Sequence, residues 1–220
     1  MLKNYFKIAL RVLLRNKFYS IINIFGLAVG LASFILIAIY IQDELSYDKQ
    51  HSMGKNIYRV IEKIDNAEGQ GENSSSNPFP VGPSLQNDYP HLIEQQVRFF
   101  NFQDEKHTLQ VGDKKYNEKY TFFADSNVLN LFDFPLQSGD REKVLSNPNS
   151  IVLTKELAQK YFGNEDPIGK LLKFDGVIDL LVTGIFGDLP QQTHLKFSAL
   201  ISFSTLRQMV GPDLQIKNWI

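Results

Sequence analysis

The sequence has no cysteine in its 220 residues, and this absence excludes several kinds of chemistry. No disulfide can stabilise the fold, no thiol can act as a nucleophile, and a lipoprotein signal, which needs a cysteine, is excluded. The four histidines are scattered, and none has a second histidine at the spacing that metal sites use. A G-x-S-x-G nucleophile motif is also missing. The sequence therefore predicts a protein that is not an enzyme, with no catalytic residues, metal ligands or cofactor-binding residues.

Charge is absent from the 25 residues 18–42. A helix of this length spans about 37 Å, enough to cross a hydrocarbon core of about 30 Å with some tilt. The run is apolar on every face, whereas a surface helix of a soluble protein keeps a polar face. We therefore predict a transmembrane helix over 18–42. The alternatives are a buried core helix and a cleaved signal peptide, although the run exceeds a signal h-region of about 7–15 residues and lacks a cleavage site.

Acidic residues are absent from residues 1–17, which contain five basic ones. The opposite flank of the apolar run carries Asp43, Glu44 and Asp48, with only Lys49 against them. Because an excess of lysine and arginine marks the cytoplasmic side, we predict a cytoplasmic N-terminus and an external domain over 43–220.

The basic residues before the apolar run are regularly spaced. Lys3, Lys7, Arg11 and Arg15 recur every four residues, so a helix places them on one arc and leaves mostly apolar residues elsewhere. A basic amphipathic helix beside a membrane span lies in the headgroup plane and faces anionic lipid. We predict such a cytoplasmic helix over 1–17, with the lipid bilayer as its partner. A basic flank without defined structure is the alternative.

The external part, residues 43–220, has fewer basic than acidic residues. Removing the five basic residues of 1–17 leaves 18 Lys+Arg against 24 Asp+Glu. Nucleic-acid phosphates need a basic face, so a nucleic-acid partner is excluded.

The external part reads as α+β and strand-rich. Alternation of apolar and polar residues and turn residues predict strands at 57–64, 95–102, 108–111, 115–123, 150–153, 171–174 and 177–185. Short helices are predicted at 78–89 and 126–131, and a third runs from its Thr154 cap to Phe162. The polar residues 65–77 predict a loop, and Asp175-Gly176 predicts a two-residue hairpin turn.

The segment Gly163–Lys170 superficially resembles a phosphate loop. Five residues separate its glycines instead of four, Leu171 replaces the Ser/Thr after the lysine, and the segment ends a helix instead of opening one. A structural interpretation fits better, because Gly163 can close the helix, Pro167 can preset a turn and Gly169 can lead into the next strand.

A family resemblance rests on several blocks in order. The run 151–170, which includes Gly163, Asp166, Pro167 and Gly169, and the run Leu181-Val182-Thr183-Gly184-Ile185 resemble the MacB-type periplasmic core domain of FtsX-like ABC transporter permeases. The blocks 9–17, 43–48 and 57–60 are similar to the start of such permeases. Of these residues, Gly163, Asp166, Pro167 and Gly169 are the family-motif positions to which we assign a structural role.

The resemblance implies a permease subunit in the plasma (inner) membrane whose 43–220 region is periplasmic. It implies a separate cytoplasmic ATPase that binds the ATP, a second permease copy, and a role in export or envelope signalling. Family members have at least four spans and this chain has one, so we interpret it as an N-terminal fragment whose core domain is incomplete at the C-terminus. The alternatives are a single-span anchored binding or sensor module and a membrane-anchored hydrolase, the latter disfavoured by the missing catalytic groups.

Within the predicted span, Gly26 and Gly30 stand four residues apart and share a face, with Asn23 and Ser33 nearby. Small residues let helices approach closely in lipid, so we predict that this face packs against another span of the permease or its twin. Chance spacing of glycines, which are common in membrane spans, is the alternative.

Overall fold

The computed structural model describes residues 2–65, 71–102 and 106–210, and the chain divides into two compact units, Met1–Tyr47 and Asp48–Ile220. In its described part the first unit consists of helices α1 (Leu2–Arg15) and α2 (Lys17–Glu44). Asn16 separates them because its φ of −107° and ψ of 55° are not helical. The Ser20 hydroxyl of α2 donates to the Leu13 carbonyl of α1 over 2.9 Å, a hydrogen bond that connects the two helices across Asn16.

Helix α2 is 28 residues long and contains no buried residue. Its most apolar 18-residue window has a mean hydropathy of 2.6, and among the described residues α2 is the one helix long and apolar enough to cross a membrane. It extends the predicted span 18–42 by one residue at its start and two at its end. Because none of its side chains is buried, the alternative of a core helix does not fit this structure.

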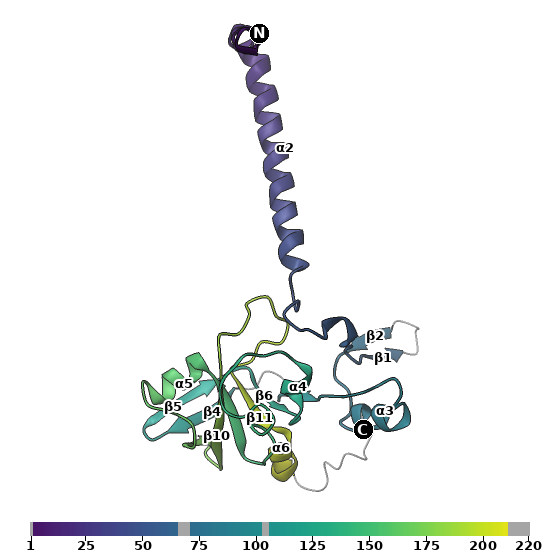
Figure 1. The fold of residues 1–220 in the computed structure, drawn as a ribbon, viewed down its shortest axis with the longest axis vertical. Coiled ribbons are helices and arrows are strands. Elements are labelled where there is room, and N and C mark those ends of the chain that lie inside the picture. The colour runs from purple at the N-terminus through teal and green to yellow at the C-terminus, as the bar shows by residue number, and fades with distance from the viewer. Residues whose placement is uncertain (1, 66–70, 103–105, 211–220) are drawn as a thin grey trace. The chain divides into compact units, whose positions relative to one another are not determined.

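The second unit is built on a mixed sheet in the order β3–β6–β11–β8–β10–β9–β4–β5, with β7 beside the end of β10. Figure 1 labels β4, β5, β6, β10 and β11 of this sheet. The pairs β6–β11 and β8–β10 are parallel, and the other described pairs are antiparallel. The strands are β3 (Phe99–Phe100), β4 (His107–Val111), β5 (Lys114–Glu118), β6 (Thr121–Ala124), β7 (Leu136–Ser138), β8 (Ser150–Thr154), β9 (Leu171–Phe174), β10 (Ile178–Phe186) and β11 (Ala199–Ser202).

Short helices accompany this sheet, and a separate hairpin lies outside it. The helices are η1 (Gly54–Asn56), α3 (Val81–Asp88), α4 (Val128–Leu131), α5 (Lys155–Phe162) and α6 (Phe203–Val210). The hairpin is an antiparallel pair of β1 (Glu62–Asp65) and β2 (Gly71–Ser74). The predicted α+β class, with an apolar N-terminal helix and a strand-rich domain, is confirmed.

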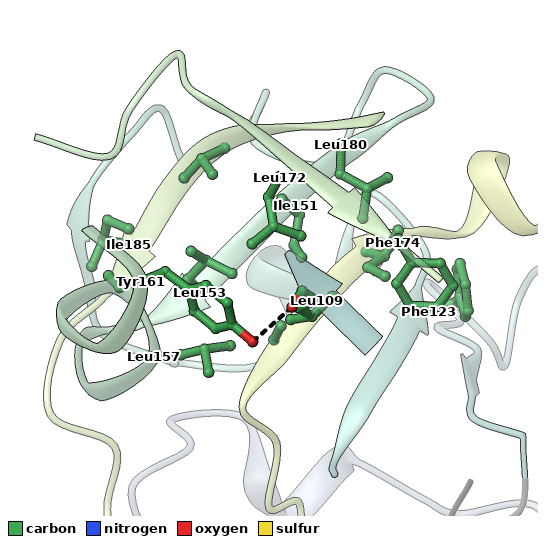
Figure 2. Packing of buried hydrophobic residues seen from close by; sticks show 14 of the residues in the cluster. Leu109, Phe123, Ile151, Leu153, Leu157, Tyr161, Leu172, Phe174, Leu180 and Ile185 are labelled. Carbon is green, nitrogen blue, oxygen red and sulfur yellow. Dashed lines mark hydrogen bonds between the residues drawn. The ribbon is translucent and has the colours of Figure 1, made fainter. Parts of the chain in front are cut away.

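Successive side chains of a strand point to opposite faces of the sheet. Both faces of the central strands are covered by apolar residues. Ile151 and Leu153 of β8 join one apolar cluster, called the first cluster here, and Val152 between them joins another, called the second cluster. Helices α5 and α6 pack in the first cluster and α4 packs in the second. Figure 2 shows the first cluster, in which the Tyr161 hydroxyl reaches the Leu109 carbonyl over 3.2 Å.

A bulge interrupts the central pair β8–β10. Val182 pairs with Ile151 and Gly184 with Val152, so Thr183 is an extra residue in β10. The Thr183 hydroxyl donates to the Val144 carbonyl over 2.5 Å. The bulge therefore fastens the loop before β8 to the middle of the sheet.

The hairpin predicted at Asp175-Gly176 forms, but its loop contains three residues, 175–177, and not the predicted two. Asp175 and Gly176 both have positive φ, 47° and 72°, and the Val177 amide donates to the Phe174 carbonyl over 3.0 Å. Strand pairing starts at Phe174 and Ile178, which leaves one residue between turn and ladder. The positive φ of both turn residues is the conformation that Asp-Gly favours, and Val177 is the additional residue.

The prediction of one half-buried strand over 57–64 and a loop over 65–77 was wrong in part. The strand is β1, at 62–65, and Tyr58 before it is 84% exposed. Part of the predicted loop forms β2, because strand pairing needs backbone groups and no apolar side chains. Residues 66–70 lie outside the described residues.

Two other predicted strands are shorter than expected. The strand over 95–102 is reduced to β3, because the Arg98 amide donates to the Asp125 carboxylate, 2.8 Å away, and not to a neighbouring strand. The strand over 115–123 is divided into β5 and β6 by Tyr120, whose φ is +60°. The helix predicted at 78–89 is α3, which is shorter at both ends. The helix predicted at 126–131 is α4, which starts two residues later.

Candidate functional site

The chain enters its second unit through residues 48–56, called the junction segment here. Asp48 has a φ of +54°, and its amide donates to the Gln192 carbonyl over 3.0 Å. Its carboxylate accepts from the Thr193 hydroxyl (3.1 Å) and the His194 amide (3.2 Å), and lies 2.6 Å from His194 Nδ1. Asp48 thus holds the loop between β10 and β11.

The ionisation of Asp48 supports this contact. Partial burial alone would raise the pKa of the carboxyl, but the hydrogen bonds from His194 and Thr193 outweigh it and lower the pKa below its usual value. The carboxylate therefore stays charged at neutral pH and keeps its hydrogen bonds.

A second anchor of the junction segment is His51, which is only 7% exposed. Its ring meets the edges or faces of Phe132 (5.2 Å between centroids) and Phe134 (5.3 Å) in T-shaped contacts. Its Nδ1 accepts from the Asp133 amide over 3.1 Å, and the Asp133 carboxylate accepts from the Ser52 amide. This Ser52 hydrogen bond is the main cause that lowers the pKa of Asp133.

Together the two anchors fasten the junction segment to two separate loops, both of which contribute apolar residues to the second cluster. Asp48 holds the loop before β11, and His51 and Ser52 hold residues 132–134 between α4 and β7.

Sequence reasoning missed this arrangement. Asp48 and its partner His194 are 146 residues apart, and His51 and Asp133 are 82 apart, so no local spacing relates them. The one available signal was the block 43–48, which ends at Asp48 and was assigned only as part of a resemblance.

The structure places the two motif glycines at the ends of the turn after α5. Gly163 has a φ of +63°, and its amide donates to the Gln159 carbonyl over 2.9 Å. Gly169 has a φ of +78°, and its amide donates to the Val182 carbonyl over 2.8 Å. Positive φ at both positions strongly favours glycine.

The residues between these glycines form a hydrogen-bonded turn. The Asp166 carboxylate accepts from the Ile168 amide over 3.0 Å, and the Pro167 carbonyl accepts from the Lys170 amide over 3.1 Å. The Lys170 ammonium forms an ion pair with Glu165, whose pKa this contact lowers. In a phosphate loop this lysine would contact a phosphate. Here Lys170 is paired with the Glu165 carboxylate instead.

A buried polar contact connects α5 to the β4–β5 hairpin. The Tyr161 hydroxyl lies 2.8 Å from the Glu118 carboxylate, which also accepts from the Lys160 ammonium over 2.6 Å. Burial and then Glu118 raise the pKa of Tyr161, so the phenol keeps its proton and acts as a donor. Because each group already has a partner, this contact is structural.

Other candidate sites are few in the described part of the chain. Within the described residues, no three histidine, aspartate or glutamate side chains gather where they could hold a metal ion. Nothing lies within 4 Å of a Cβ placed on Gly26 or Gly30, so this face of α2 is open in the structure.

Comparison with known proteins identifies the family. Residues 20–217 match the model of the MacB-like periplasmic core domain. A domain of a putative permease protein from Porphyromonas gingivalis is 22% identical, with a TM-score of 0.57 over 73% of this chain. This chain spans 65% of the length of that one.

Two further structures are similar at TM-scores below 0.5. The periplasmic region of MacB from Actinobacillus actinomycetemcomitans is 18% identical, with a TM-score of 0.44 over 62% of this chain and 60% of its own. The extracellular domain of the transporter YknZ from Gram-positive bacteria is 19% identical, with a TM-score of 0.39 over 49% and 55%. No curated protein matches the chain. Because the family model covers most of the sequence, the chain belongs to the family of MacB-like periplasmic core domains of MacB/FtsX-type ABC transporter permeases.

Proposed function

We propose that the chain is the N-terminal part of an ABC transporter permease subunit that couples a cytoplasmic ATPase to a periplasmic domain, for export or envelope signalling. The observation that carries this proposal is the junction segment. A part that relays motion needs a firm connection between the moving helix and the responding domain, and Asp48 and His51 supply two anchors on separate loops.

The proposed topology follows from charge and length. Helix α2 crosses the plasma (inner) membrane, α1 lies on its cytoplasmic surface, and residues from Asp43 onward are periplasmic. The family match begins at residue 20, inside α2, which supports a helix that belongs to the domain and is not a removed signal peptide.

The partners follow from the family. The family implies an ATPase partner, and we propose that it is a separate subunit that binds the ATP, with a second permease copy beside α2. The chain itself binds no nucleotide and catalyses no reaction in this proposal, and nucleic acid is not a partner.

The absence of cysteine allows a direct test of topology. We expect Tyr58→Cys and Val177→Cys, at positions 84% and 81% exposed, to react with a membrane-impermeant maleimide in spheroplasts. Lys7→Cys should react only after lysis. Labelling of Lys7→Cys in intact spheroplasts, or protection of the other two, would overturn the topology.

A second measurement separates the permease from a single-span sensor. The complete native protein, tagged and solubilised in mild detergent, should co-purify with an ABC ATPase, and Asp48→Ala should retain this partner while changing its rate of ATP hydrolysis. Purification without an ATPase would favour the anchored sensor or binding module.

A further inference from the structure

The neighbouring strands β6 and β11 run parallel and end together, with Ala124 opposite Ser202. The chain then leaves them in opposite directions. Val128 of α4, which follows β6, packs in the second cluster, whereas Leu206 of α6, which follows β11, packs in the first cluster on the other face. Such a divergence at the carboxyl ends of parallel strands opens a crevice, which is where open sheets bind ligands.

A cavity of about 160 Å³ occupies this place. That volume is close to the roughly 150 Å³ that holds one benzene molecule and well below the roughly 300–1,000 Å³ of drug-sized pockets, so the cavity fits one small chemical group. Its polar lining comes from four segments of the chain and comprises Arg98, Asp125, Ser126, Ser146, Ser202, Ser204 and Arg207.

Arg98 and Asp125 in the cavity wall form an ion pair whose charges sum to zero. Arg98 Nη2 lies 2.7 Å from Asp125 Oδ1, and Arg98 Nε donates to Oδ2 over 2.9 Å. The guanidinium also lies over the Phe203 ring, 4.1 Å from its centroid. Because the Asp125 carboxylate faces Arg98 through both oxygens, it repels an incoming anion little.

Two of the remaining polar groups, on Arg207 and Ser126, are donors that the described structure leaves available, whereas the Ser146 hydroxyl donates to the Lys143 carbonyl over 2.8 Å. Arg207 and Ser126 are both exposed at the mouth of the cavity, and among the described residues neither side chain makes an ion pair or a hydrogen bond. The Ser202 hydroxyl donates to the Leu145 carbonyl over 2.9 Å and lies 2.7 Å from that of Ser204. The lining therefore has a net charge of +1 from Arg207, together with one available hydroxyl donor, that of Ser126.

From this geometry we infer that the crevice between α4 and α6 is a binding site for a small oxyanion group, a carboxylate or a phosphate. Arg207 supplies the charge, Ser126 supplies a neutral donor, and the closed Arg98–Asp125 pair forms a fixed wall. The inference goes beyond the proposed transport role and does not depend on membrane topology.

The test uses the full chain in detergent micelles with inorganic phosphate and acetate as probes, at constant ionic strength set by sodium chloride. We expect saturable binding of radiolabelled phosphate in equilibrium dialysis, or of acetate in calorimetry. Arg207→Gln should weaken it at least tenfold, as expected for the loss of a charge-assisted hydrogen bond. Ser126→Ala should weaken it by a smaller factor.

Arg59→Gln is the matched control, because Arg59 is an exposed arginine in the segment before β1 and the substitution changes net charge equally. It should bind like the parent, and circular dichroism should show that all variants are folded. Binding of phosphate alone identifies a phosphate group, and binding of acetate alone identifies a carboxylate. Equal affinity in Arg207→Gln and the parent, or no saturable binding of either probe at millimolar concentration, overturns the site.

Discussion

Two glycines of the family blocks are required for different physical reasons. Gly163 has a φ of +63°, which strains the backbone of any residue with a side chain, although there is open space around it. Gly184 is opposed by packing, because a Cβ at this position would lie 2.9 Å from Val144 and 3.2 Å from Val152. The sequence indicates the first kind of glycine through its place after a helix, but gives no local sign of the second.

Gly184→Ala should therefore destabilise the domain although alanine favours the same backbone. Overpacking of a buried strand costs about 1–3 kcal/mol. Chemical unfolding of the full chain in micelles, followed by circular dichroism, measures the difference. Gly187→Ala is the control, because its Cβ would meet Pro135 at 3.4 Å, an ordinary contact. Equal stabilities of the two variants would contradict this account of Gly184.

The charge of Asp48 should make part of the stability depend on pH. Because the folded-state pKa of Asp48 is lowered, its contribution is present above the unfolded pKa of about 3.9 and is lost as the pH falls through the folded value. Asparagine tolerates the same positive φ, so Asp48→Asn removes the charge and keeps the backbone. We expect a loss of about 1 kcal/mol near neutral pH, modest because the side chain is 41% exposed.

The difference between Asp48→Asn and the parent should shrink between about pH 5 and pH 3 in the same unfolding experiment. Asp113→Asn serves as the comparison, because Asp113 is exposed at the β4–β5 turn. A difference for Asp48→Asn that stays constant over this range would show that its charge does not hold the junction segment.

At the scale of elements, helices and hairpins with strong local signals formed where the sequence predicts them. Helix α5 starts at the Thr154 cap, whose hydroxyl accepts from the Leu157 amide over 3.3 Å, and ends before Gly163. Helix α2 contains the whole uncharged run and extends past it by one residue at its start and two at its end. What α2 packs against in the bilayer is a separate question, and the Gly26 and Gly30 face stays a prediction.

Gly26→Ile with Gly30→Ile should weaken association of α2 with a neighbouring span while leaving insertion intact, because isoleucine is bulkier and more apolar. Disulfide cross-linking in membranes, through one cysteine added to the cysteine-free chain, measures the association. The matched pair Ala28→Ile with Ala32→Ile has the same spacing on another face. Equal cross-linking of both double variants would mean that the glycines are incidental.

At the scale of the whole molecule, one sheet connects the junction segment, the turn after α5 and the crevice between α4 and α6. Strand β11 is shared by two of these places, because the loop held by Asp48 precedes it and α6 follows it. Motion at the junction segment is therefore expected to reach the crevice through β11.

The whole chain should bind no nucleotide, because Lys170 is paired with Glu165 and the turn follows a helix. A fluorescent ATP analogue should show no saturable binding to the chain in micelles, and Lys170→Ala should leave the signal unchanged. Saturable binding that Lys170→Ala abolishes would contradict this prediction and revive a phosphate-loop function for the segment.

The sequence alone was sufficient for features whose cause is local. An uncharged run specifies α2 because bilayer thickness sets its length, and Asp175-Gly176 specifies its hairpin because both residues tolerate positive φ. It was insufficient for Tyr58, where alternation suggested a half-buried strand and the side chain is exposed. Alternation gives the period of a strand but does not say whether another element covers it.

The sequence by itself determined the apolar helix, the α+β class, the turn after α5 and the family. Only the tertiary structure decided that β11 lies in the middle of the sheet, since its four residues are too short and too uniformly buried to show a period. It also decided the contact of Asp48 with His194 and the gathering of Arg98, Ser126 and Arg207 around one crevice. These contacts join residues far apart in the chain, and pairing of that kind is set by strand order and packing, which no local pattern of side chains encodes.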